Sequence, residues 1–487
     1  MFRPYAIPRL RDVLFLAVFI AAVLLGPRMM SLDSDLGRHL ALGGYILDRH
    51  TIPTRDIFSH TLSGEPRPAY EWLSQIGFAL AYRVLGLDGT ILLCALILGV
   101  AFSLTHADAE KRSGTPLLTL LIMILAMAAS SLHWLPRPHL FTFLFLALWI
   151  ERLERARRGE AIPLWHFSLL MLAWVNMHGG FIFGALVWLA YFAGWVWENL
   201  IAGFRKTNWK TPMIGAASLP MTILTPSGLG NWEAVLNNNS RYILSRTIET
   251  MPADFTQPGA LPFAALLCLT LVLFARNGKN IPPAHYFLLG GFALLGLLMA
   301  RNIPLFAIAC APILAEGLGA WTASAPRWKT METNIVGVEK TLRGGLWNLT
   351  VCAAAALILW IRFEVRGEAY AQFNPKVFPV AASDWLETHP QSGNMFNDFN
   401  WGGYLLFRVW PRDKVFLDSQ TDFYGEALAR EYETALTAGE GWESVLEKYA
   451  ARWTIIRADS PLAKALSRDR AWELIYSDAI ASVFKRK

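Results

Sequence analysis

Long apolar runs alternate with short polar segments along most of this chain, and the runs stop near residue 362. A helix needs about 20 residues to cross about 30 Å of hydrocarbon, so we predict about eleven membrane-spanning helices. The first run follows a basic head and lacks a small-residue cleavage site, so we interpret it as an uncleaved span. The predicted spans lie roughly at 13–30, 88–107, 115–134, 139–155, 165–178, 179–198, 212–228, 259–276, 282–299, 304–321 and 345–362.

Two regions break this apolar pattern. The segment "YEWLSQIGFALAYRVLG" (70–86) is too short to span and carries Arg83, so it predicts an amphipathic helix in the membrane interface. Beyond residue 363, "KVFLD" and "WTIIRAD" predict strands, and "EALAREYETALTAG" and "WESVLEKYAA" predict helices. We therefore expect a transmembrane domain (1–362) with a first outer loop (31–87), followed by a small soluble α/β domain (363–487).

Composition supports a polytopic α-helical membrane protein. Hydrophobic residues make up 54% of the chain and charged residues 17%, whereas soluble proteins carry about 25% charged residues. The net charge of +6 is better explained by cationic loops that set topology than by nucleic-acid binding. The four cysteines lie in apolar runs without a CxxC motif, which argues against a disulfide framework or a thiolate metal site.

The distribution of cationic residues predicts sidedness. With a cytoplasmic N-terminus, the cytoplasmic segments hold 18 Lys and Arg in 76 residues, and the outer segments hold 10 in 98. This asymmetry follows the positive-inside rule. It predicts that the first loop and the C-terminal domain lie on the periplasmic side of a bacterial inner membrane.

Titratable residues gather directly after the first span, in "SLDSDLGRHLALGGYILDRHTIPTRDIFSHT" (31–61). Asp35 and His39 are four apart and share a helix face. A carboxylate at the mouth of the bundle could take the proton of an acceptor hydroxyl. Asp33 and Asp35 could instead bind a divalent cation, which prefers oxygen ligands, or Asp33 could simply cap a helix.

The segments "DSDLGRHLALGGYIL", "TIPTRDIFSHT" and "YEWLSQ" resemble the first outer loop of bacterial proteins in the GT-C glycosyltransferase superfamily. That superfamily includes protein mannosyltransferases and lipid A aminoarabinose transferases, and its layout of many spans and an outer C-terminal domain fits this chain. The resemblance implies an inverting transfer from a polyprenyl-phosphate-linked sugar, with Asp35 or Asp33 as the base. The continuation "PTRDIFSHT" departs from the better-studied members, so substrate roles for Asp56 and His60 are inferred from this chain alone.

Other groups are expected at the same mouth. Arg137, between two prolines, and Arg301, before Pro304, have the planar donors that suit phosphate, although interfacial arginines also bind lipid headgroups. His178, beside two glycines, and Glu71 are further candidates for substrate binding, as is His39. A structural histidine and a carboxylate that complements a helix dipole are the alternatives.

The acceptor is left open as lipid, glycan or protein. The polar loop 229–258 and the segments "FNDFNWGGYLLF" and "LDSQTDFY" gather aromatic and polar residues that suit sugars. No GxxxxGK[ST], no GxGxxG after a strand and no HExxH occurs, which argues against an ATP-driven pump, a nucleotide-sugar site and a zincin. We expect a membrane glycosyltransferase. The alternative is a non-enzymatic lipid or polysaccharide transporter or an assembly scaffold, although no internal repeat and no mid-span carboxylate typical of transporters is present.

Overall fold

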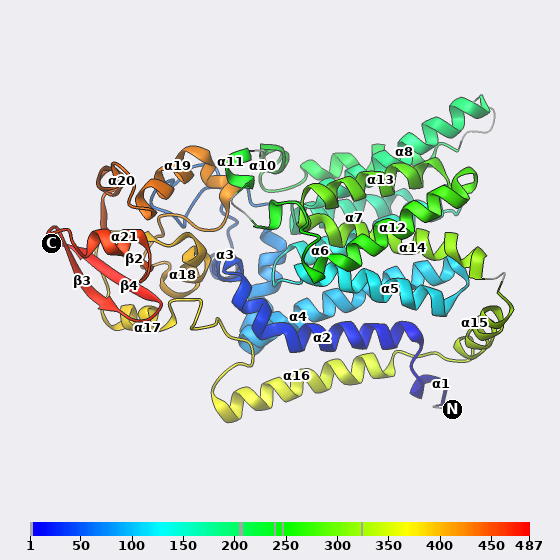
Figure 1. Ribbon diagram of the computed structural model, residues 1–487, viewed down its shortest axis with the longest axis horizontal. Coiled ribbons are helices and arrows are strands. Elements are labelled where there is room, and N and C mark those ends of the chain that lie inside the picture. Colours follow the sequence, from blue (N-terminus) through cyan, green and yellow to red (C-terminus); the bar gives the residue numbers. More distant parts are fainter. Residues whose placement is uncertain (1–2, 204–207, 238–239, 246–247, 323–324) are drawn as a thin grey trace.

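The computed structural model describes residues 3–203, 208–237, 240–245, 248–322 and 325–487. A helical bundle occupies one side of the molecule in Figure 1, and a smaller α/β part lies at the other side. The bundle contains α1 (Arg3–Ala6), α2 (Leu10–Leu32), α3 (Asp35–Arg49), α4 (Trp72–Ser113), α5 (Pro116–Ser130), η1 (Ser131–His133), α6 (His139–Arg157), α7 (Leu164–Met177), α8 (Phe181–Ala202), α9 (Lys210–Ser218), η2 (Leu219–Ile223), α10 (Gly230–Asn237), α11 (Arg241–Leu244), η3 (Ile248–Thr250), η4 (Pro258–Ala260), α12 (Leu261–Asn277), η5 (Gly278–Asn280), α13 (Pro283–Leu298), η6 (Ala300–Asn302), α14 (Ile303–Thr322), α15 (Pro326–Glu339) and α16 (Leu346–Arg366).

The C-terminal part, residues 367–487, is built on one small sheet. Its strand order is β1-β2-β4-β3, with β1 parallel to β2 and the other pairs antiparallel. Its elements are α17 (Val380–Thr388), β1 (Asn394–Asn397), η7 (Phe399–Trp401), α18 (Gly402–Val409), α19 (Thr421–Leu436), α20 (Trp442–Lys448), β2 (Ala451–Arg457), α21 (Pro461–Leu466), β3 (Trp472–Ser477) and β4 (Ala481–Arg486).

Helices form at all eleven positions where the apolar pattern predicted a span. Within the described part of the chain, seven are long and apolar enough to cross a membrane: α2, α4, α5 with η1, α8, α12, α14 and α16. Helices α7 and α13 are apolar but shorter, α6 ends in the charged sequence "ERLERAR", and α9 gives way to a 3-10 helix after nine residues. The chain is therefore a polytopic integral membrane protein, as the composition predicted.

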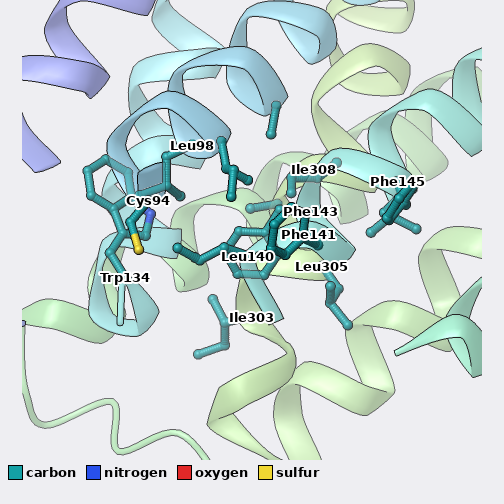
Figure 2. Packing of buried hydrophobic residues seen from close by; sticks show 14 of the residues in the cluster. Cys94, Leu98, Trp134, Leu140, Phe141, Phe143, Phe145, Ile303, Leu305 and Ile308 are labelled. Carbon is teal, nitrogen blue, oxygen red and sulfur yellow. The ribbon is translucent and has the colours of Figure 1, made fainter. Parts of the chain in front are cut away.

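The bundle packs around α14. About 83% of the most apolar stretch of α14 is buried inside the protein. The corresponding share is 6% for α16, which lies beside α2 at the edge of the bundle. Figure 2 shows the packing between side chains of α4, α6 and α14, including Leu98, Phe143 and Ile308. This apolar packing holds the ends of α6 and α14 together, and those ends carry polar residues of the site.

Helix α4 has two sections that meet at a glycine. Gly86 has φ of +59°, which L-residues with a side chain rarely adopt, and the helical angles are interrupted at Leu85 and Gly86. The break falls where the predicted interfacial helix ends. The first section of α4 packs against α3, and the second section continues into the bundle.

Two glycines allow α3 to approach its neighbours closely. A Cβ on Gly43 would lie 2.0 Å from the carbonyl oxygen of Gln75 in α4. A Cβ on Gly37 would lie 2.2 Å from the carbonyl oxygen of Gly403 in α18. Since backbone atoms cannot move aside as a flexible side chain can, these glycines fix α3 between the bundle and the C-terminal part.

This contact gives a first testable prediction. Gly37→Ala should lower the thermal unfolding midpoint of the purified protein, because the new methyl group forces α3 and α18 apart at a cost of about 1–3 kcal/mol. Gly44→Ala, on the same helix, is the matched control because nothing lies within 4 Å of its added Cβ. Equal midpoints for the two variants would show that α3 and α18 do not pack this closely.

The strand predictions were correct in one of two cases. "WTIIRAD" overlaps β2, whereas "KVFLD" is not a strand of the sheet. Val415 instead forms an isolated parallel bridge with Ser59. The apolar residues of "KVFLD" are therefore buried by docking on the first loop, defined here as residues 33–71, and in the core of the C-terminal part, rather than by sheet pairing.

Candidate active site

A cavity of about 350 Å³ lies where the first loop, the polar turns of the bundle and the C-terminal part meet. Six of the nine residues predicted for the site line it, although they come from segments far apart in the sequence. These are Asp35, His39, Glu71, Arg137, His178 and Arg301.

Asp33 lies behind the cavity and is fully engaged. Its Oδ1 accepts hydrogen bonds from Arg137 Nη2 at 2.7 Å and from the backbone N–H of Asp35 at 2.9 Å, and its Oδ2 accepts one from Arg137 Nε. It is only 4% exposed. Asp33 precedes the N-cap residue of α3, Ser34, and is therefore not itself the N-cap; its side chain accepts the N–H of the first residue of α3 and also holds the arginine.

Asp35 is the carboxylate that faces the cavity. Its Oδ2 lies 3.2 Å from Arg137 Nε, and its Oδ1 has no hydrogen-bond partner in the described part of the protein. Burial raises the pKa of Asp35 to about 6, against the opposing effect of Arg137. Asp35 can therefore exchange a proton near neutral pH.

Arg137 is shared among three carboxylates. Besides Asp33 and Asp35, its Nη1 donates to Glu249 Oε2 at 3.1 Å. All three nitrogens of its guanidinium are thus already directed at protein oxygens. This arrangement suits orientation of the aspartates better than capture of a phosphate.

Arg301 differs from Arg137 in its surroundings. It lies in η6, the turn directly before α14, and lines the cavity. None of the described residues forms a side-chain hydrogen bond or ion pair with its guanidinium. A guanidinium that is only partly exposed and lacks a protein acceptor is suited to bind an anionic ligand.

Glu71 occupies the cavity among cationic and imidazole groups. Its carboxylate lies 3.7 Å from Arg38 Nη1, 3.8 Å from His39 Nδ1 and 3.8 Å from His178 Nε2. Burial raises the pKa of Glu71 to about 7. Burial also holds the pKa of His39 well below its usual range, so His39 is neutral at physiological pH.

His178 presents a defined hydrogen-bond donor. Its Nδ1 accepts the backbone N–H of Gly180 at 2.9 Å and lies 2.8 Å from Thr142 Oγ1. A backbone N–H can only donate, so the proton of the neutral ring resides on Nε2, which faces Glu71. Burial lowers the pKa of His178 to about 3, and the ring therefore stays neutral.

Several lining residues were not predicted from the sequence. Arg38 lies one turn after Asp35, so the helical spacing of "DLGRH" could have indicated it. Asp422 lies in the segment "LDSQTDFY", which was singled out for sugars but not for this cavity. Asp422 is held in place by Tyr70, which donates to its Oδ2 at 3.1 Å. Glu249 also lines the cavity, and no local sequence pattern indicates that it belongs to the site.

Two residues with inferred substrate roles lie elsewhere. Asp56 is buried outside the cavity and accepts hydrogen bonds from Arg67, Ser59 and the backbone of Phe58. His60 Nε2 lies 2.8 Å from the carbonyl oxygen of Met395. Asp56 therefore stabilises the first loop from within, and His60 connects that loop to the C-terminal part.

The aspartate pair does not fit a resident cation. Among the described residues, no group of three or more His, Cys, Asp and Glu side chains could hold a metal ion. Both oxygens of Asp33 are occupied by Arg137 and the backbone of Asp35.

Comparisons with known proteins identify the fold. No protein-family model matches the sequence, and no curated protein matches it significantly. The solved structure of the archaeal oligosaccharyltransferase AglB from Archaeoglobus fulgidus, in complex with an inhibitory peptide and a dolichol-phosphate, matches with a TM-score of 0.62 at 12% identity. The match covers 91% of this chain and 69% of AglB.

ArnT from Cupriavidus metallidurans, bound to undecaprenyl phosphate, matches with a TM-score of 0.52 at 11% identity, over 97% of both chains. The chain has the GT-C fold. Figure 1 shows the first loop between the bundle and the C-terminal part.

Proposed function

We propose that this protein is an inverting glycosyltransferase that moves a sugar from a polyprenyl phosphate to an acceptor hydroxyl. The observation that carries this proposal is a single cavity that holds Asp35, with one oxygen that has no hydrogen bond to a described residue, and Arg301, a cation that forms no ion pair with a described residue. A base and an anion-binding group are the two elements that such a transfer requires. AglB and ArnT, which share the GT-C fold, are in complex with lipid phosphates.

The reaction follows from these two groups. Asp35 takes the proton of the acceptor hydroxyl while the oxygen attacks the anomeric carbon of the donor sugar. The bond from that carbon to the phosphate oxygen breaks, and its electron pair leaves with the phosphate. Arg301 stabilises the charge on the leaving phosphate. Attack opposite the leaving group inverts the anomeric centre.

The other lining residues would orient these participants. The ion pair between Asp33 and Arg137 fixes the position of Asp35, and His178 Nε2–H can donate to a phosphate or sugar oxygen. We assign residues 1–362 to the membrane domain and 363–487 to the soluble domain. The charge distribution supports placing the site on the periplasmic face of a bacterial inner membrane.

Lipid-phosphate binding tests the role of Arg301. Arg301→Gln should weaken the affinity of the purified protein for undecaprenyl phosphate by about 10–100-fold, because hydrogen bonds to a charged group contribute about 1.5–3 kcal/mol. The control is Arg83→Gln, since Arg83 pairs with Asp48 at 2.5 Å outside the cavity. Equal loss in both variants would point to general attraction to lipid and would remove Arg301 from the phosphate site.

Release of polyprenyl phosphate separates an enzyme from a transporter or scaffold. Incubated with polyprenyl-phosphate sugars and with an envelope extract that supplies acceptors, both from bacterial membranes, the purified protein should free the carrier phosphate. Binding of the carrier without any release over many hours would contradict the transferase and favour a carrier-binding protein.

A further inference from the structure

A second cavity, of about 490 Å³, lies beside the first. The first loop forms one wall of it, the segment 226–234 forms another, and the start of α19 forms the third. Thr54, Pro66 and Glu233 are exposed, so this cavity opens to the surroundings of the protein. It is large enough for a short oligosaccharide segment.

The two cavities share a wall. Ala234, Gln420 and Asp422 line both of them. Asp422 is held there because Tyr70 donates to its Oδ2, and Gln420 is held by Arg67 and Arg38 through its Oε1. A molecule in the second cavity therefore lies against the same side chains that border the catalytic cavity.

The lining of the second cavity combines carboxylates with flat apolar rings. Asp422 and Glu233 supply acceptor oxygens, and within the described residues the carboxylate of Glu233 forms no hydrogen bond or ion pair. Phe423, Pro66 and Pro68 supply flat apolar surfaces. Sugars present hydroxyl donors at their edges and C–H groups on their faces, which matches this combination.

The same lining disfavours an anionic ligand. Arg67 is buried and already engaged by Asp56, Asp418 and Gln420. Arg55 Nη1 donates to the carbonyl oxygen of Gly64 at 2.9 Å. The lining contains no arginine or lysine other than these two, whereas the two carboxylates would repel a phosphate.

We propose that the second cavity binds the acceptor, and that the acceptor is a carbohydrate whose reacting hydroxyl passes between Ala234 and Asp422 toward Asp35. This inference rests on the proposed function and adds to it the acceptor class and the place where the acceptor binds. The segment "LDSQTDFY" and residues 230–234, at the start of the polar loop singled out from the sequence, then meet in one site.

The test uses the full-length purified protein with two fractions from bacterial envelopes. One fraction contains polyprenyl-phosphate sugars, and the other contains glycans and glycolipids. The readout is the ratio of polyprenyl phosphate released with the glycan fraction to that released without it. Thr54→Trp and Glu233→Trp each place a bulky ring in the second cavity from a different wall, and we expect the glycan concentration for half-maximal stimulation to rise about tenfold or more, since overpacking a site costs about 1–3 kcal/mol.

Glu65→Trp is the matched control, because Glu65 is exposed on the same loop but does not line the cavity. The glycan fraction should stimulate release of polyprenyl phosphate by this variant as much as by the wild type. Unchanged stimulation in both cavity variants would overturn the location of the acceptor site.

Chemical treatment of the glycan fraction tests the acceptor class. Periodate, which cleaves vicinal diols, should remove the stimulation, and exhaustive proteolysis should leave it intact. Stimulation that survives periodate and is lost on proteolysis would overturn the carbohydrate assignment in favour of a protein acceptor.

A binding measurement keeps this inference separable from the proposed function. Immobilised wild-type protein should retain periodate-sensitive glycans, and the Thr54→Trp and Glu233→Trp variants should not. Retention without any release of polyprenyl phosphate would refute the transferase but support the glycan site. Equal retention by the wild type and both variants, or none by any of them, would overturn the site.

Discussion

Replacing Asp35 with asparagine is expected to lower sugar transfer by about 10²–10⁴-fold, which is the usual contribution of a positioned general base. The amide keeps the shape of the side chain and cannot accept the proton. Release of polyprenyl phosphate from the donor fraction measures the effect. Asp48→Asn on the same helix is the control, because Asp48 is exposed and pairs only with Arg83 at the surface. Transfer within twofold of the wild type in Asp35→Asn would remove Asp35 as the base.

The pH dependence provides a second signature of the same residue. Burial raises the pKa of Asp35 to about 6, and a base acts only when deprotonated, so transfer should rise with pH through this value. Arg137 lowers the pKa of Asp35. Arg137→Gln should therefore move the acidic limb of the profile of transfer rate against pH to higher pH. A pH–rate limb that stays in place would mean that the rate is controlled by a group whose pKa does not depend on Arg137, which would exclude Asp35 as the base.

Replacing Arg67 with methionine is expected to destabilise the protein by about 3–5 kcal/mol, the range for removing one partner of a buried ion pair. Arg67 Nη1 donates to Asp56 Oδ1 at 2.7 Å, and Nη2 donates to Asp418 Oδ2 at 2.9 Å. Its guanidinium also lies 4.6 Å from the ring centre of Phe423. Methionine has a similar length but would leave two buried carboxylates without their cation.

The thermal unfolding midpoint in detergent measures this loss. Arg457→Met is the control, because Arg457 and Asp459 are both exposed and such surface pairs contribute only about 0–1 kcal/mol. Adding Asp418→Asn to the Arg67→Met variant should recover part of the midpoint by removing one unpaired charge. A midpoint equal to that of the control would show that Arg67 does not join the first loop to the C-terminal part.

The sequence singled out six residues that line the cavity, but it did not indicate the state of each of them. Asp35, Arg137 and Arg301 were recognisable because charged residues next to the ends of apolar runs are costly unless they face a cavity. Their different states were not recognisable. Arg137 forms hydrogen-bonded ion pairs with Asp33 and Glu249, whereas Arg301 forms none with the described residues, and the contacts of Arg137 join segments more than a hundred residues apart.

Asp56 shows the opposite case. Its place in a polar, histidine-containing stretch suggested contact with substrate, yet it holds Arg67 together with Asp418, 362 positions further along the chain. No spacing within the first loop indicates such a partner. The segment "KVFLD" likewise has a strand-like composition, yet in the structure Val415 pairs with Ser59 of the first loop instead of with the sheet.

The sequence by itself determined which segments are helical and apolar. A membrane requires each spanning segment to satisfy its own backbone hydrogen bonds, and whether a segment can do so depends on its own residues. The sequence also determined that charged groups gather after the first span. Only the tertiary structure decided which of these charges are neutralised by partners and which remain open to a ligand. The reason is that an ion pair depends on the distance between two side chains in space, and packing of α3 against α4 and α18 sets those distances here.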